Sequence, residues 1–362
     1  MKDFERFLLA ILATSVSSSV DRSPLDISLS EADWKDFLKL AQSHGVASLV
    51  TDQLQNFPAE KRPPKYILMP LVGHLLQQEK RYRWQLQTAN MLAEALKEKG
   101  VQMKVLKGIS FSTYYHKSEL RECGDCDIYL GEHFEVGNQV VCDIGGIAER
   151  GTYKHSHLLL NGLLIENHRY ITDFHGTKKG VKLEQMLQKY AKMPGSLING
   201  TVLVRPNAHF NAIHLLRHAH GNLMLGGMTL RMIYDWTVFL RGEQSNLDCH
   251  QLYADLEECG LRNFAEVLTG VSVRYFGLKL TNEKLLSSND SILVERVLID
   301  TLRDGNYLIP NESFWHKTKR ICARFKRMWR FRELAIESVP MMLWNSFAFS
   351  SYMKRDIRLE EY

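Results

Sequence analysis

Two aspartates one residue apart, Asp125 and Asp127, interrupt the otherwise apolar segment GDCDIYL. On a β-strand, residues two apart project from the same face, so both carboxylates point one way while their neighbours point into the other layer. Two unpaired carboxylates this close repel each other, and a half-buried strand tolerates them only where a cation or a basic group compensates. The pair therefore indicates a divalent metal site that suits Mg²⁺, or Mn²⁺ in its place. Alternatively, both acids are exposed at a strand end or paired with Arg121 and Lys107.

Candidate phosphate and metal ligands lie on both sides of this pair. Lys107 and Gly108 follow the apolar segment VQMKVL and precede a short predicted helix, so a lysine and backbone N–H groups would face an anion at that turn. Downstream, Glu166 and His168 are again two apart and share one strand face. If their strand pairs beside the aspartate strand, Glu166 becomes a third carboxylate. Three carboxylates beside a glycine turn are typical of metal-dependent phosphoryl or nucleotidyl transfer.

The order of these residues resembles the uncharacterised nucleotidyltransferase family of bacteria, a branch of the polymerase β-like nucleotidyltransferase superfamily. The positions that carry the resemblance are Lys107, Gly108, Tyr115, Arg121, Gly124, Asp125, Asp127, Glu166 and His168. The helical N-terminal part, the segment YKHSH and the later TLRMIYDW also look like that family's pattern, so the resemblance covers about residues 1 to 240.

The resemblance implies a nucleotidyltransferase core in which Asp125 and Asp127 are metal ligands and Glu166 is the third acid. In the broader superfamily, glycine is followed by glycine or serine at the phosphate turn, whereas this chain reads Lys107-Gly108-Ile109-Ser110. The expected reaction is Mg²⁺-dependent transfer of a nucleotidyl group from a nucleoside triphosphate to a hydroxyl acceptor. The residues expected to bind the substrate are Lys107, Gly108, Ser110, Arg121, His168 and Arg231.

Two other functions are open at this point. A glycosyltransferase can use the same acid pair on a nucleotide-sugar, although the chain lacks an N-terminal nucleotide-binding βαβ pattern. The chain could instead be a non-catalytic binding module that keeps the fold. The acceptor also stays open among a small sugar, a lipid head group, a nucleic-acid end and a protein hydroxyl.

The helices and strands expected around these residues indicate an α+β fold. Helical spacing covers 29–56, with Ser30 as the N-cap, and 66–99. Three or four strands follow, including a hairpin that turns at Asn161-Gly162, with short helices near ISFSTYYH and EHFEVGNQVVCDIGG. We expect a helical region at 1–99, a small mixed-sheet nucleotidyltransferase core at 100–180 and a second helical region at 181–362.

Composition is that of an ordinary globular protein with a mild basic excess. The formal net charge is +5 and the pI about 8.7, which fits a phosphate-bearing ligand without requiring nucleic acid. The six cysteines are sparse, so we interpret them as free thiols in a cytoplasmic protein. The CxxC at Cys123 and Cys126 has no second pair to complete a metal site. No run of eighteen apolar residues predicts a membrane span, and FLLAILATSV, although it resembles a signal-peptide core, favours an amphipathic helix that packs on the core.

Several further residues have two interpretations. Arg231 and Asp235 are spaced as an intrahelical ion pair, or Arg231 binds phosphate. His155 and His157 share a strand face and could line the pocket. The segment WHKTKRICARFKRMWRFRELA could touch an anionic surface or nucleic acid, but a solvated helix with its aromatic face packed inward is favoured. Four histidines near one another fit helix packing or capping better than a metal site: His209, His214, His218 and His220.

Overall fold

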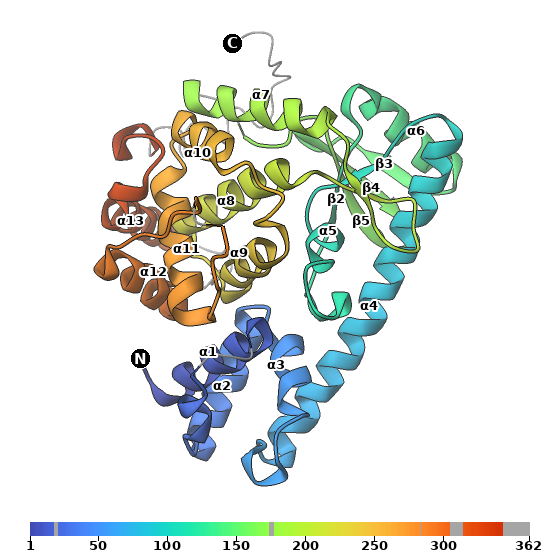
Figure 1. Cartoon of the computed structure of the whole chain (residues 1–362). Helices are drawn as coiled ribbons and strands as arrows, with labels where there is room; N and C mark the ends of the chain where they lie inside the picture. Colours follow the sequence, from blue (N-terminus) through green and yellow to red (C-terminus); the bar gives the residue numbers. More distant parts are fainter. Residues whose placement is uncertain (18–20, 174–176, 283, 305–313, 343–362) are drawn as a thin grey trace.

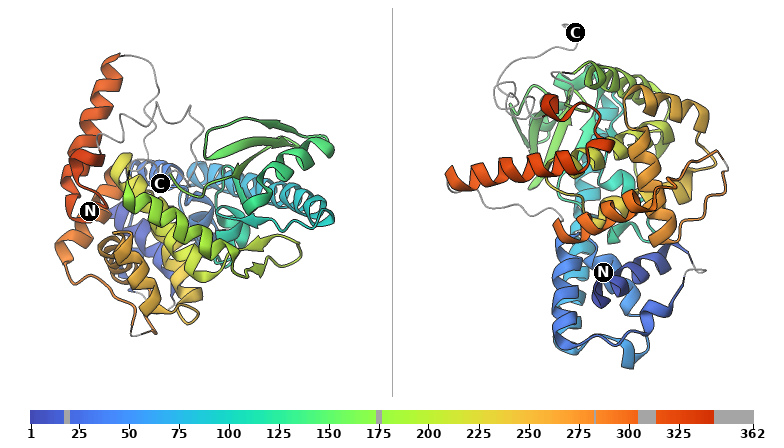
Figure 2. Two further views of the ribbon diagram at one scale, coloured as in Figure 1. Left: turned by 90° about the horizontal axis from the view of Figure 1, so that it is seen from above. Right: turned by 90° about the vertical axis from the view of Figure 1, so that its left-hand side faces the viewer.

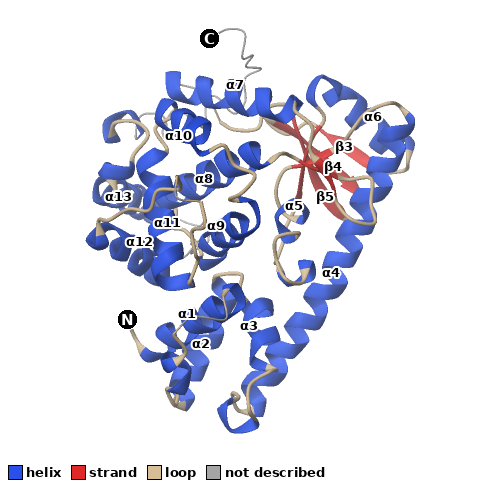
Figure 3. Cartoon of the chain, in the orientation of Figure 1, coloured by secondary structure: helices blue, strands red, loops and turns tan. Residues whose placement is uncertain are grey.

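The computed structural model describes residues 1–17, 21–173, 177–282, 284–304 and 314–342. Within these ranges a single mixed sheet of seven strands lies among helices, with the strand order β3-β4-β5-β2-β1-β7-β6 (Figure 1, Figure 3). The α+β prediction is confirmed, but the sheet is wider than the three or four strands expected. The strands are β1 Lys104–Val105, β2 Cys126–Tyr129, β3 Ile147–Glu149, β4 His155–Leu160, β5 Leu163–His168, β6 Ser196–Leu197 and β7 Val204–Arg205.

Strand β5 pairs with β4 on one side and with β2 on the other. It forms a hairpin with β4 through Asn161 and Gly162, whose φ angles of 48° and 82° are both positive, as the Asn-Gly signal predicted. On its other side β5 pairs in parallel with β2, which places Asp127 directly beside Glu166. Two strands distant in the sequence therefore bring the predicted acids together.

One face of the sheet is apolar and is covered by helices. Cys126, Ile128 and Ile165 belong to a buried cluster with residues of α4 (Lys65–Glu98) and α6 (Phe134–Asp143). Figure 1 shows α4 running from the N-terminal helices up to the sheet. The predicted long helix at 66–99 is thus confirmed. Because side chains alternate along a strand, the aspartates emerge on the opposite face of the sheet.

The larger core joins the N-terminal and C-terminal helices. α1 (Asp3–Val16) buries Phe7 edge-on against Trp34 and Phe37 of α2 (Glu31–Ser43), with ring centroids 5.4 and 5.9 Å apart. This confirms the prediction of a packed N-terminal helix, and Ser30 caps α2 as expected, since its hydroxyl accepts from the backbone N–H of Asp33. The other α-helices are α3 Ala47–Leu54, α5 Ile109–Ser112, α7 Lys178–Lys192, α8 Ala208–Leu225, α9 Leu230–Glu243, α10 Cys249–Glu258, α11 Arg262–Phe276, α12 Ser291–Asp304 and α13 Phe314–Arg330. Short 3₁₀ turns are η1 Ser23–Asp26, η2 Ala59–Lys61, η3 Ser118–Leu120, η4 Gly131–His133 and η5 Arg332–Leu334.

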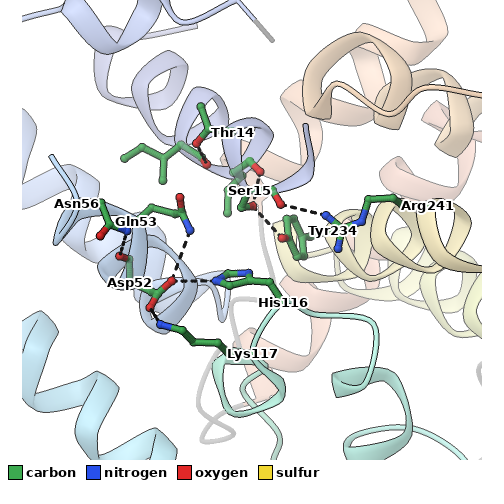
Figure 4. Close-up of polar contacts among 11 residues, drawn as sticks. Thr14, Ser15, Asp52, Gln53, Asn56, His116, Lys117, Tyr234 and Arg241 are labelled. Carbon is green, nitrogen blue, oxygen red and sulfur yellow. Dashed lines mark hydrogen bonds and ion pairs between the residues drawn. The ribbon is translucent and has the colours of Figure 1, made fainter. Parts of the chain in front are cut away.

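Polar contacts connect the N-terminal helices to the elements beside the sheet (Figure 4). Asp52 of α3 binds Lys117 and lies 2.8 Å from the Nε2 atom of His116, both in the loop after α5. The Ser15 hydroxyl lies 2.8 Å from the Tyr234 hydroxyl of α9. These contacts fix α1 and α3 against the loop and helix that approach the acidic face of the sheet.

The prediction for the basic C-terminal helix α13 is wrong for two of its aromatic residues. Phe325 and Trp329 are 44% and 55% exposed and stack on each other, whereas Met328 and Phe331 are buried. Figure 2 shows α13 at the edge of the helical region. In the last turns of the helix Met328 therefore packs inward, as does Phe331 directly after it, and the aromatic pair lies on the solvent side.

Two sequence expectations about thiols and membranes concern the chain as a whole. All six cysteines are unpaired, which confirms their interpretation as free thiols. Of the helices in the described residues, none combines the length and apolar character required to cross a bilayer.

Candidate active site

The strand register brings three carboxylates together at one edge of the sheet. Asp125 precedes β2, Asp127 lies within it, and Glu166 is the β5 residue paired with Asp127. One carboxylate oxygen from each of the three lies within 4.8 Å of the others. Asp125 is exposed, Glu166 half-buried and Asp127 only 2% exposed. The common face predicted for the two aspartates is confirmed. Glu166 was expected beside them only if its strand paired with theirs, and this condition is met.

Asp127 is held by two basic side chains. Its Oδ1 atom lies 3.0 Å from Lys107 Nζ and 2.9 Å from His168 Nε2. Burial alone would raise the pKa of Asp127, but Lys107 and His168 lower that pKa well below its usual range. Lys107 is thus the basic partner that the alternative interpretation named.

These partners do not neutralise the whole cluster. Glu166 Oε2 lies 3.5 Å from His168 Nε2, and Asp125 forms no ion pair with any of the described residues. The three carboxylates face Lys107, His168 and His155. Burial lowers the pKa of His155 to about 4, so negative charge remains in excess even when His168 is charged. Three oxygen donors with excess negative charge fit a hard divalent cation such as Mg²⁺.

Gly108 shapes the turn that carries Lys107. Its φ of 54° and ψ of −108° belong to a backbone region that side chains disfavour. A Cβ atom here would lie 3.4 Å from the backbone oxygen of Asp125 and 3.7 Å from Cys123 Sγ. The turn therefore packs closely on the chain that enters β2, and this close approach fixes Lys107 relative to the aspartates.

Replacing Gly108 by alanine is expected to lower the free energy of unfolding by about 1–3 kcal/mol, because a residue with a Cβ atom is strained at this positive φ. Urea denaturation measures the change. Gly73 is the matched control, since it lies exposed in α4 with no atom within 4 Å of an added Cβ. Gly73→Ala should stabilise the chain by about 0.5–1 kcal/mol. Equal stability of Gly108→Ala and the unsubstituted protein would contradict the strained turn.

Arg121 lies behind this turn in a buried ion pair. Its Nε and Nη2 atoms donate to the two carboxylate oxygens of Asp235 in α9, at 2.9 and 2.8 Å. Its Nη1 atom donates to the carbonyl of Gly108 at 3.3 Å, and the Tyr115 hydroxyl donates to Asp235 at 2.8 Å. The interpretation of Arg231 and Asp235 as an intrahelical pair is wrong, because Asp235 pairs with Arg121. The guanidinium that was expected at a phosphate instead joins the glycine turn to α9.

The other predicted substrate ligands occupy two different environments. Ser110 is fully buried under the turn, and its hydroxyl has no hydrogen-bond partner among the described residues. Arg231 is half-buried, donates through Nη1 to the backbone oxygen of Glu122, and has a buried Nε without a partner in the described part of the chain. Arg231, Lys107 and His218 line one small cavity between α8, α9 and the turn. The structure thus groups Arg231 with Lys107 and leaves the Ser110 side chain outside the cavity.

Two α8 histidines, His214 and His218, face this region, which the sequence did not predict. Burial and the nearby charge of Lys107 lower the pKa of His214 to about 3 and also lower that of His218. By contrast, His209 and His220 contact backbone oxygens of Asp248 and Leu334, as the packing interpretation predicted. The i, i+4 spacing of His214 and His218 was the available signal, but spacing alone does not show which element a helix face meets.

His155 and His157 share one strand face, as their spacing predicted, and this face is the acidic one. Their Nε2 atoms are 3.1 Å apart, and His155 Nδ1 lies 3.7 Å from Glu166 Oε2. His155, Glu166 and His168 form a second group whose ligand atoms lie within 4.8 Å of one another. Glu166 therefore belongs to two potential metal-binding groups.

Comparison with known proteins gives one match. A family model described as uncharacterised nucleotidyltransferase matches residues 30–277, which is more than half of the 362-residue chain. The matched range contains the three carboxylates, the glycine turn and Asp235. Neither the curated proteins nor the solved structures gave a match.

Proposed function

Because the chain belongs to the uncharacterised nucleotidyltransferase family, we propose that it transfers a nucleotidyl group from a nucleoside triphosphate to a hydroxyl acceptor. The observation that carries this proposal is the convergence of Asp125, Asp127 and Glu166 beside the Lys107-Gly108 turn. The acids would hold Mg²⁺, or Mn²⁺ in its place. The unpaired cysteines are consistent with a cytoplasmic setting.

In the proposed reaction the acceptor oxygen attacks the α-phosphorus. The bond from that phosphorus to the oxygen bridging the α- and β-phosphates breaks, and pyrophosphate leaves with the bonding electrons. A divalent cation bound by Asp125 and Asp127 would neutralise charge on the reacting phosphate. Glu166 would accept the hydroxyl proton, or it would complete the acceptor side of the metal site while that proton leaves to water. Lys107 would place its positive charge beside the phosphates while it keeps its ion pair with Asp127.

Arg231 supplies a second cation for the triphosphate. Its guanidinium forms no ion pair among the described residues, and it lines the cavity that Lys107 also lines. A phosphate oxygen placed there would meet a lysine and an arginine, and an arginine donates to phosphate in a fixed planar geometry. Arg121 has a positioning role, because Asp235 and the Gly108 carbonyl occupy its donors.

The proposal is tested by calorimetric titration of ATP, CTP, GTP and UTP with and without Mg²⁺. We expect at least one nucleotide to bind only in the presence of the metal, and Asp125→Asn to weaken that binding tenfold or more, since one oxygen ligand loses its charge. Asp36→Asn, a change at an exposed residue of α2, is the matched control and should bind like the unsubstituted protein. Absence of metal-dependent binding of every nucleotide would favour a non-catalytic module, and binding of nucleotide-sugars alone would favour a glycosyltransferase.

A further inference from the structure

We propose that Glu166 is shared by two cation positions, and that His155 and His168 hold the second with a preference for Zn²⁺ over Mg²⁺. This inference rests on the proposed function only for the first position, on Asp125 and Asp127. The second position depends on the hairpin of β4 and β5 alone. Its geometry points to an ion for which the sequence alone offered no complete set of ligands.

Strand pairing brings the three donors to one point. His155 and His168 are direct partners across the β4–β5 ladder, so both rings rise from the same face. Glu166 precedes His168 by two residues and shares that face. Its Oε2 atom lies 3.7 Å from His155 Nδ1 and 3.5 Å from His168 Nε2. An ion about 2.1 Å from each donor would set neighbouring donors about 3.0–3.4 Å apart, so small side-chain movements suffice.

The hydrogen bonds of His168 orient its ring as a metal ligand. Its Nδ1 atom lies 3.1 Å from the carbonyl oxygen of Tyr170, which can only accept, so Nδ1 carries the hydrogen. Nε2 then points at the carboxylates of Asp127 and Glu166. Histidine ligands of metals commonly donate their other ring N–H to a carbonyl in this way. A bound ion would replace the hydrogen that joins Nε2 to Asp127, and that proton would leave to solvent.

His155 offers a ring nitrogen that is available as a ligand. Its Nδ1 atom is buried and has no hydrogen-bond partner among the described residues. Its Nε2 atom lies 3.1 Å from His157 Nε2. When His155 Nε2 donates to His157, the lone pair of Nδ1 points toward Glu166. His157 thereby positions the ring of His155 without touching the ion.

The donors of the two positions differ in chemistry. The first offers carboxylate oxygens only, the ligands that Mg²⁺ prefers. The second offers two imidazole nitrogens and one carboxylate oxygen. Imidazole suits Zn²⁺ and related transition metals, whereas Mg²⁺ binds it poorly. The shared carboxylate of Glu166 would therefore join two ions of different kinds.

The test is calorimetric titration of the metal-stripped full chain with ZnCl₂ and with MgCl₂, without nucleotide. We expect Zn²⁺ to bind at least a hundredfold more tightly than Mg²⁺. His155→Ala should weaken Zn²⁺ binding tenfold or more, and His157→Ala by about tenfold, as for other residues that orient a ligand. His250→Ala, at an exposed histidine of α10, is the matched control and should change nothing.

A second measurement tests the site without any substitution, in case the His155→Ala variant does not fold. A crystal of the unsubstituted protein soaked in ZnCl₂ should show an anomalous peak between His155, Glu166 and His168. A peak elsewhere, or Zn²⁺ affinity unchanged in a folded His155→Ala variant, would overturn the inference. Because no nucleotide is present, failure to bind Zn²⁺ would not contradict the proposed nucleotidyl transfer. Failure to bind nucleotide would equally not contradict the Zn²⁺ site.

Discussion

Replacing Asp127 by asparagine is expected to lower the rate of nucleotidyl transfer by about a thousandfold or more, which corresponds to about 4 kcal/mol of transition-state stabilisation. The substitution keeps the shape of the side chain but removes the charge that would bind the cation. Asp127 is also the acid that Lys107 and His168 orient, so the geometry of the cluster depends on it. The measurement is release of pyrophosphate from the nucleotide that binds, with fractions of a cell extract as acceptors.

A stability effect must be separated from this loss of rate, because Asp127→Asn leaves the half-buried Lys107 without its charged partner. The double variant Asp127→Leu with Lys107→Met removes both charges and should recover most of the free energy of unfolding, yet stay inactive. Asp125→Asn, at the exposed member of the cluster, should lose rate while keeping normal stability. An Asp127→Asn protein that turns over at the unsubstituted rate would exclude the proposed chemistry.

The part of the site that could be predicted from sequence is the part governed by strand alternation. Asp125 and Asp127, and then Glu166 and His168, had to share faces because side chains on a strand repeat every two residues. The Asn161-Gly162 turn fixed the hairpin that carries Glu166, since both residues accept positive φ. Strand alternation and turn type therefore identified both strands that carry the acidic cluster. Whether these two strands pair with each other could not be predicted.

The contacts that could not be predicted join segments far apart in the chain. Asp235 lies four residues after Arg231, which suggests a local pair, yet it binds Arg121 more than a hundred residues earlier. The two-residue strand β7 pairs with β1, but two residues are too few to show any period. The α8 histidines likewise face the site because of long-range packing, which decides which face of α8 is turned toward Lys107. Side-chain spacing carries no information about such packing.

Substituting alanine for Asp235 is expected to lower the free energy of unfolding by about 3–5 kcal/mol, the usual cost of leaving one partner of a buried ion pair alone. Arg121 would keep its charge in a buried site without its carboxylate partner, and the hydroxyl of Tyr115 would lose its acceptor. Urea denaturation followed by circular dichroism measures the change. Lys35→Ala breaks an exposed ion pair with Glu31 and serves as the control, with an expected effect below about 0.5 kcal/mol.

A double substitution separates the charge of this pair from its role in the site. Arg121→Met with Asp235→Leu replaces the ion pair by apolar side chains of similar volume, so the cost of an unpaired charge should disappear. A deficit of about 1–3 kcal/mol should remain, because the Tyr115 hydroxyl still lacks its acceptor. Nucleotide turnover should remain low, because the carbonyl of Gly108 loses the donor that joins the turn to α9. Full turnover in the stable double variant would show that Arg121 does not position the turn. A change below 1 kcal/mol in Asp235→Ala alone would show that the guanidinium finds another partner.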